Sequence, residues 1–215
     1  MKHTILAILL LAHAALLAQT DTTRKDWEWG VGAAFSYQII RAEKFNGFSQ
    51  TVTDNYEVEG IGGMAMSGGF VVLRHLNDSW TLKPQLYGVL SNARVRYKFT
   101  TEPAHTYQVY PLSVELAVMA EKVFGQGIRR PTVSFGGGMD YLIEPLGSQV
   151  LVLKPYDFVA RFGVGLKNQA RKSTWSVDLL FSIGLRQLAE NEGSIYNQST
   201  GLLQRNAVGL YFSFY

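Results

Sequence analysis

Apolar and polar residues alternate with a period of two along most of this 215-residue chain. Between Trp27 and Ile39 the odd positions are aromatic, branched or alanine, and the even positions are small or polar. This alternation is typical of a β-strand with one apolar face. After residue 18 no apolar run approaches the roughly 18 residues that a transmembrane helix needs, so the sequence favours a sheet.

Similar segments recur and together predict about eight strands, the number in the smallest closed membrane barrel. The further segments are 64–74, which is apolar on both faces, 80–91, 110–121, 133–143, 158–166, 175–186 and 208–214. The connections are long at 41–60, 92–106 and 187–204, medium at 144–156, and short at 76–79, 125–130 and 167–173. Long outer loops that alternate with short periplasmic turns are typical of outer-membrane barrels. We therefore expect an all-β, eight-stranded, antiparallel, up-and-down transmembrane β-barrel with both termini in the periplasm.

A soluble sandwich or a lipocalin-like barrel would also alternate, and the charges distinguish these alternatives. Only 17% of the residues are charged, against about 25% in ordinary soluble domains. A soluble barrel carries its charge on the outside, whereas here the polar faces hold few charges among many glycines, as a narrow lumen requires. This distribution favours the membrane barrel.

The N-terminus resembles a secretory signal peptide. Lys2 precedes an apolar run from Ile5 to Ala18 that is broken only by His13, and polar residues follow it. The run of roughly 14 residues is shorter than the ~20 that span a bilayer, which disfavours an uncleaved anchor. We expect cleavage after Ala18, so that residues 1–18 are the signal and 19–215 form the barrel.

Composition excludes several functions. The chain has no cysteine, so it forms no disulfide, thiolate metal site or acylated lipoprotein N-terminus. Its formal net charge is only +3 and no basic cluster contains interleaved aromatics, so nucleic-acid binding is not expected. No cluster has metal-ligand spacing, and neither glycine-rich stretch has P-loop order; we expect no cofactor.

Aromatic residues gather at the strand ends that the topology places in the periplasm. All four tryptophans lie there, as in the interfacial girdle of a membrane barrel. The predicted girdle comprises Trp27, Trp29, Trp80, Phe124, Trp175, Phe212 and Phe214.

Charged residues on the polar faces are the main candidates for a site. The predicted lumen network comprises Glu28, Lys83, Glu115, Glu121, Asp140, Arg161, Asp178 and Arg186, with Asp157 as a further carboxylate. These charges could form a proton or ion path, or a salt-bridged plug. The plug is favoured because an eight-stranded lumen is just wide enough for side chains to fill it.

Catalysis has little support in the sequence. Only His75 and His105 follow the signal, neither lies in a catalytic motif, and we expect both to be exposed. Paired carboxylates in the outer loops, such as Asp54 with Glu57, are read as solvated. The basic turn residues Arg129, Arg130, Arg171 and Lys172 either dock an acidic periplasmic partner or, as we favour, hydrate the turns.

The chain resembles the PorT-like family of outer-membrane β-barrel proteins over nearly all of its mature length. The residues that carry the resemblance are Leu82, Pro84, Leu86, Tyr87, Tyr110, Pro111, Leu112, Phe124, Gly125, Pro131, Gly136, Gly137, Gly138, Tyr141, Phe158, Phe162, Gly163, Gly165 and the aromatic C-terminus. The resemblance implies an outer-membrane location and, for the best-known members, a part in type IX protein secretion. The C-terminus also resembles the signal read by the barrel assembly machinery, in the register of Phe214 rather than of Tyr215.

These features lead to one expectation and two alternatives. We expect a non-enzymatic accessory barrel of a secretion or envelope machine. It would contact outer-membrane lipid, the assembly machinery during insertion, and secretion or envelope proteins. The alternatives are a passive structural barrel or narrow pore and, with less support, a surface enzyme.

Overall fold

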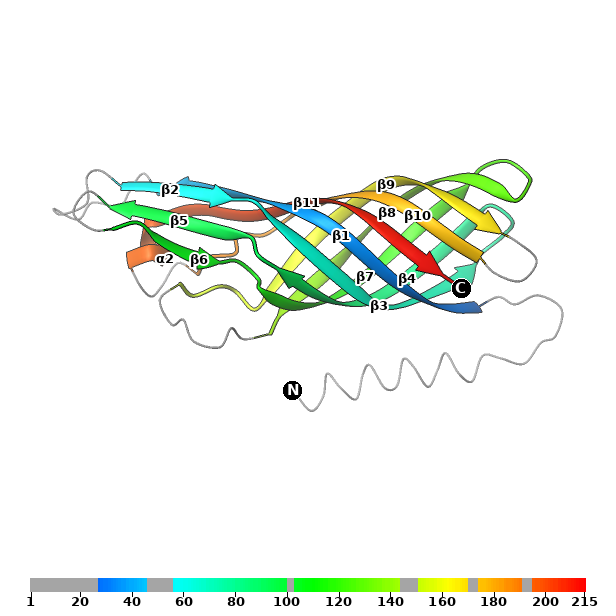
Figure 1. Cartoon of the computed structure of the whole chain (residues 1–215), viewed down its shortest axis with the longest axis horizontal. Helices are drawn as coiled ribbons and strands as arrows, with labels where there is room; N and C mark the ends of the chain where they lie inside the picture. Colours follow the sequence, from blue (N-terminus) through cyan, green and yellow to red (C-terminus); the bar gives the residue numbers. More distant parts are fainter. Residues whose placement is uncertain (1–26, 46–55, 100–102, 144–150, 170–173, 191–194) are drawn as a thin grey trace.

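Eight strands close into a barrel in the computed structural model, which describes residues 27–45, 56–99, 103–143, 151–169, 174–190 and 195–215 (Figure 1). The predicted signal peptide lies outside the described residues. The barrel strands are β1 (Trp27–Lys44), β3 (Gly63–His75), β4 (Trp80–Ser91), β7 (Leu112–Val123), β8 (Arg129–Leu142), β9 (Tyr156–Gln169), β10 (Thr174–Gly184) and β11 (Thr200–Phe214). Each pairs antiparallel with the next, and β11 pairs with β1 to close the ring. The predicted eight-stranded antiparallel barrel is thereby confirmed.

The two ends of the barrel differ. The start of β1, the end of β11 and the short connections after β3 and β7 lie at one end, which we call the turn end (Figure 1). The longer connections lie at the other end, as the alternation of connection lengths predicts.

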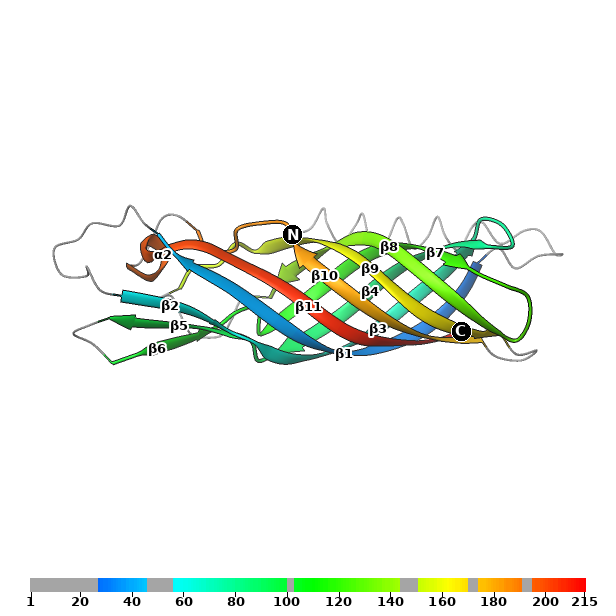
Figure 2. The ribbon, with the colours of Figure 1, turned by 90° about the horizontal axis from the view of Figure 1, so that it is seen from above.

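Two of the long connections contain strands, so the interpretation of 41–60 and 92–106 as loops alone was wrong. β2 (Tyr56–Ile61), β5 (Arg94–Phe99) and β6 (His105–Gln108) form a separate three-stranded sheet in the order β2-β5-β6. With the short helix α2 (Ile195–Ser199) they form an extension that we call the crown (Figures 1 and 2). The strict alternation of basic and apolar residues from Arg94 to Phe99 is a signal that could have identified β5.

The crown has its own hydrophobic core. Inward-facing residues of its sheet pack with α2 and with the far ends of β1 and β11. Buried members of this core are Ile40, Tyr56, Ala93, Val95, Tyr97, Phe99, Val109, Tyr110, Leu142, Leu151, Leu188, Ala189, Tyr196 and Leu203.

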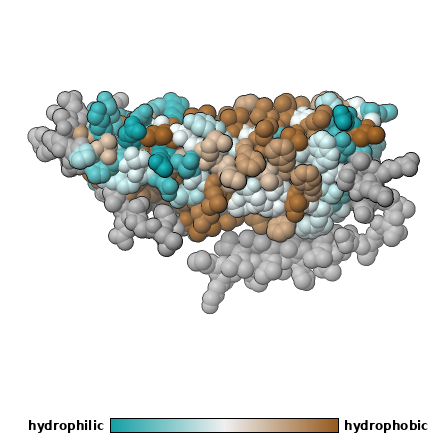
Figure 3. Space-filling view, in the orientation of Figure 1, coloured by the Kyte–Doolittle hydropathy of each residue, from teal (hydrophilic) through white to brown (hydrophobic). Residues whose placement is uncertain are grey.

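The barrel wall is apolar outside and polar inside. Phe70 and Leu90 are 63% and 62% exposed, whereas Lys83 and Glu121, which face inward, are 2% and 0% exposed. Apolar residues cover the barrel surface in Figure 3, and polar residues cover the crown end. Ten residue steps along β1, from Trp29 to Ile39, rise about 33 Å, or about 25 Å along the axis of a barrel whose strands tilt by 35–45°, which matches the apolar band of a membrane barrel. Among the described residues no helix is both long and apolar enough to cross a bilayer.

Tyr110 departs from the predicted fourth strand. Its φ of 51° lies in the left-handed region, so the backbone bends there and β7 begins only at Leu112. The ring is fully buried instead of facing outward. Its hydroxyl donates a hydrogen bond to the carbonyl of Lys154 at 2.6 Å, which fixes the ring at the mouth of the barrel.

Candidate functional site: the closed lumen

A four-residue ion-pair network fills the lumen near the turn end. The Lys83 ammonium lies 2.8 Å from an Asp178 oxygen and 3.1 Å from a Glu121 oxygen. Lys167 reaches the other oxygen of Glu121 at 3.1 Å. All four side chains are at most 3% exposed. Two cations and two carboxylates thus balance one another in this turn-end network.

A second network lies nearer the crown. Arg161 grips Glu115 with two guanidinium nitrogens, each 2.5 Å from a carboxylate oxygen, and donates to the Ser182 hydroxyl at 3.1 Å. Arg205 binds Asp140 and lies 3.4 Å from Asp157. This crown-end network therefore contains three carboxylates but only two guanidinium groups. Asp140 faces Glu115 on one neighbouring strand and Asp157 on the other, which concentrates the negative charge.

A cavity of about 20 Å³ lies beside the crown-end network, enough for about one water molecule. Its lining comprises Ser36, Gln38, Ser67, Val89, Glu115, Asp140, Val159, Arg161, Ser182, Arg205, Ala207 and Tyr211. Most of these are polar, so the space suits a water and not an apolar ligand.

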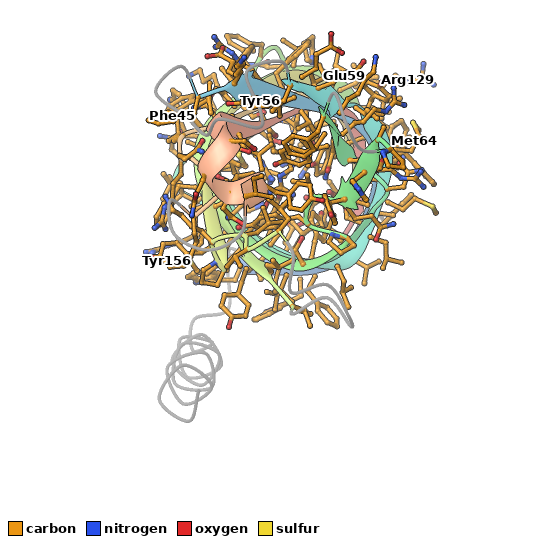
Figure 4. All side chains as sticks on the ribbon, turned by 90° about the vertical axis from the view of Figure 1, so that its left-hand side faces the viewer. Phe45, Tyr56, Glu59, Met64, Arg129 and Tyr156 are labelled. Carbon is orange, nitrogen blue, oxygen red and sulfur yellow. The ribbon has the colours of Figure 1, made fainter. Side chains whose placement is uncertain are left out.

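The crown core closes the barrel beyond the crown-end network. The Tyr110 ring lies 4.8 Å from the Arg205 guanidinium carbon, so the apolar core begins directly above the ion pairs. Figure 4 looks along the barrel from this end and shows side chains across the interior, with α2 over the mouth and Met64 and Tyr156 at the outer perimeter. Polar networks and an apolar cap thus obstruct the lumen in series.

Close packing in the lumen depends on glycine. A Cβ on Gly32 would lie 2.1 Å from the Tyr87 hydroxyl, and one on Gly165 would lie 2.0 Å from an Asp178 oxygen. Because Tyr87 is fully buried, neither its ring nor the side chains of the turn-end network can move aside for an added Cβ. These glycines supply the clearance that large lumen side chains require.

The structure brings six of the eight predicted network residues into the two networks. These six are Lys83, Glu115, Glu121, Asp140, Arg161 and Asp178. Glu28 lies at the turn end, where its carboxylate is 3.2 Å from His75 Nε2. Arg186 differs from the prediction because β10 ends at Gly184; it leaves the alternating register, and its guanidinium lies 4.0 Å from the Tyr156 ring centre.

Sequence reasoning missed two of the network cations. Lys167 was placed in a turn, but β9 continues to Gln169 and carries this lysine into the lumen. Arg205 fell between the last long connection, 187–204, and the predicted strand 208–214, but β11 already begins at Thr200. Lys167 and Arg205 lie in the lumen-facing register of Arg161 and of Tyr211, respectively, so extending each alternating pattern would have identified both.

The predicted girdle residues all lie near the turn end, at strand ends or directly beside them. Trp175 faces Phe214 across β10 and β11, and Trp80 begins β4. Trp29, Phe124 and Phe214 are 49%, 46% and 56% exposed. The apolar wall therefore ends in exposed or half-buried rings at this end.

The two histidines are less exposed than expected. His75 hydrogen-bonds through its two ring nitrogens to Glu28 and to Thr81. His105 lies in β6, half-buried, with its ring 5.9 Å from that of Tyr196. In the described parts of the chain no group of three or more histidines and carboxylates could hold a metal ion. Of the paired loop carboxylates, Asp54 lies outside the described residues and Glu57 lies 3.9 Å from Lys98.

An aromatic cluster organises the crown. Tyr196 of α2 packs edge-on against Tyr97, Phe99 and Tyr107, with ring centres 5.0 to 5.7 Å apart. The Tyr97 hydroxyl lies 2.8 Å from that of Thr200, and burial raises the pKa of Tyr97 to about 12. The phenol stays protonated at neutral pH and can donate this bond, which ties β5 to the start of β11.

Comparison with known proteins identifies a fold but no family. No family model matches the chain, and no curated protein resembles it significantly in sequence. The outer membrane protein OprG from Pseudomonas aeruginosa aligns over 86% of this chain and 94% of its own, with a TM-score of 0.51 and 10% identity. The N-terminal β-barrel domain of OprF from Pseudomonas aeruginosa aligns over 85% and 96% (TM-score 0.40, 13% identity), and the outer membrane enzyme PagL over 84% and 97% (0.38, 12%). The likeness to OprG shows that this chain has the fold of an eight-stranded outer-membrane β-barrel.

Proposed function

We propose that this protein is a closed, non-enzymatic barrel of the outer membrane that holds the crown beyond the lipid surface for contact with other proteins. The observation that carries the proposal is the double closure of the lumen, by two ion-pair networks and then by the crown core. A barrel closed in this way cannot act through its interior, which leaves its outer surfaces for function.

The membrane location is supported by the apolar outer wall and its aromatic rim. The start of β1 and the C-terminal Tyr215 would then be periplasmic, because both lie at the end with short turns. Folded protein from the membrane fraction should migrate differently on a denaturing gel before and after boiling. Identical migration, with no β-sheet circular dichroism, would contradict the membrane barrel.

The closed lumen can be tested in planar bilayers. We expect no conductance steps from the wild-type protein, and none from a double variant that removes Arg161 and Glu115 together, because the crown core still caps the barrel. Steady wild-type conductance that changes when Arg161 is replaced would show instead that the lumen is an ion path, and would favour the narrow pore.

The finer proposal is an accessory role in a secretion or envelope machine, with type IX secretion suggested by the PorT-like resemblance alone. The crown supports contact-based function because its outer sheet face is charged, with Glu57 and Glu59 on β2 and Arg96 and Lys98 on β5. Purification from the native membrane in mild detergent, followed by mass spectrometry, tests this role. Secretion or envelope subunits in near-equal amount would support it, whereas a barrel that emerges alone would favour a passive structural role.

A further inference from the structure

Two cations at the turn end lie over tryptophan rings on the outer wall. Arg74 faces Trp27 across β1 and β3, and its guanidinium carbon is 5.1 Å from the indole centre. Lys122 faces Trp80 across β4 and β7, and its ammonium is also 5.1 Å from the ring centre. β1, β3, β4 and β7 are neighbouring strands of the barrel wall, in that order. Trp27, Arg74, Trp80 and Lys122 therefore form one surface, which we call the basic strip.

The two cations of the basic strip have no carboxylate partner within ion-pair distance among the described residues. Lys122 donates one hydrogen bond, to the Ser79 hydroxyl at 2.8 Å. Three of the cations on and around the crown do have such partners: Arg41 with Glu43 at 2.6 Å, Arg96 with Glu59 at 3.2 Å, and Lys98 with Glu57 at 3.9 Å. The two cations of the strip therefore carry positive charge that no ion pair with a described carboxylate neutralises, whereas these three crown cations are paired.

The donors of the strip remain available to an anion. A guanidinium over a ring interacts through its face, which leaves N–H groups at its edge free for bidentate contact with an anion. Lys122 has three N–H donors and uses one on Ser79. Both side chains point outward from the wall at the edge of the apolar band, the level at which lipid headgroups lie.

We propose that the basic strip binds the phosphate of anionic phospholipid, with one headgroup at the Arg74–Trp27 pair and another at the Lys122–Trp80 pair. The proposal rests on the membrane location proposed above. Lipid is the favoured occupant because the anion must approach from the side of the barrel wall, above exposed apolar residues. Strand spacing of about 4.8 Å and a rise of about 3.3 Å per residue place the two cation Cα atoms about 12 Å apart, which leaves room for two neighbouring headgroups.

Native mass spectrometry of the detergent-solubilised full chain tests the strip. Wild-type protein titrated with phosphatidylglycerol should retain bound lipid, and should retain several-fold less phosphatidylcholine. The double variant R74Q/K122Q should lose most of the retained phosphatidylglycerol, and raised salt should weaken wild-type retention. The matched control is R41Q, which removes a 60% exposed cation near the crown and should retain lipid as the wild type does.

The outcomes separate this proposal from the membrane barrel itself. Heat-modifiable migration of every variant shows that the barrel is folded, whatever lipid it retains. Equal retention by wild type and R74Q/K122Q, or equal loss in R41Q, would overturn the strip while leaving the barrel intact. Inorganic phosphate at the same concentration should not displace the lipid; displacement would indicate a general anion site instead.

Discussion

Replacing Arg161 and Arg186 separately by alanine should have very different effects on stability, although the sequence assigns both to one lumen network. Arg161 is 3% exposed and holds both oxygens of Glu115. Its removal leaves three buried carboxylates, Glu115, Asp140 and Asp157, with Arg205 as the remaining guanidinium of the crown-end network. Breaking a buried pair from one side costs about 3–5 kcal/mol.

Arg186 lies outside that network, and its described contact is the Tyr156 ring at 4.0 Å. A cation–π contact at an exposed or half-exposed position contributes about 0.5–1 kcal/mol. The unfolding equilibrium should therefore shift roughly a hundredfold to a few thousandfold for Arg161→Ala, and less than about tenfold for Arg186→Ala.

Urea unfolding of the refolded protein in lipid vesicles, followed by tryptophan fluorescence and by gel migration, measures both effects. With a slope of about 2–3 kcal/mol per molar urea, Arg161→Ala should lower the midpoint by about 1–2.5 M. The double variant Arg161→Met with Glu115→Leu should recover most of the loss, because no lone charge remains. Equal midpoints for Arg161→Ala and Arg186→Ala would refute the reasoning.

Further substitutions probe packing in the lumen and in the crown. Gly32→Ala should destabilise the barrel by about 1–3 kcal/mol through overpacking against Tyr87, and the same urea assay should show whether the companion change Tyr87→Phe relieves it. Tyr97→Ala removes a buried ring from the crown core, a change worth about 3–5 kcal/mol, so limited proteolysis should cut the crown faster while the barrel keeps its heat-modifiable migration. Tyr97→Phe should cost only about 1 kcal/mol, the value of the bond to Thr200; crown cleavage as fast as in Tyr97→Ala would contradict this account.

The barrel was predictable from the sequence because its signal is local. Each wall strand alternates by itself, and the parity of a residue fixes whether it faces lipid or lumen. Lys83 and Asp178 could therefore be placed inside the barrel before their partners were known. The pairing itself was not predictable, since Lys83 meets Asp178 across the lumen at a sequence separation of 95 residues and only closure of the ring brings them together.

The prediction was wrong at the ends of strands, where some predicted strands stop too early and others extend too far. Lys167 and Arg205 lie in strands that continue beyond the predicted ends, whereas Arg186 follows a strand that has already ended. Tyr110 begins the predicted alternating strand 110–121, in step with the apolar residues Leu112 and Val114, yet a left-handed backbone turn moves its ring into the crown core. Strand ends depend on tertiary contacts such as the Tyr110 hydrogen bond to Lys154, which local periodicity does not contain.

The ion pairs in the lumen serve specificity more clearly than stability. Well-packed apolar residues in place of a buried ion pair are often as stable or more stable, so closure alone does not require charge. If both faces of a strand were apolar, however, either face could contact lipid, because the alternation of polar and apolar residues specifies which face points outward. The chain already approaches this condition at Phe70–Leu73, the one wall segment where the sequence pattern was weak. Charged lumen residues on the other strands therefore fix the register of the ring, and the crown core completes the closure above them.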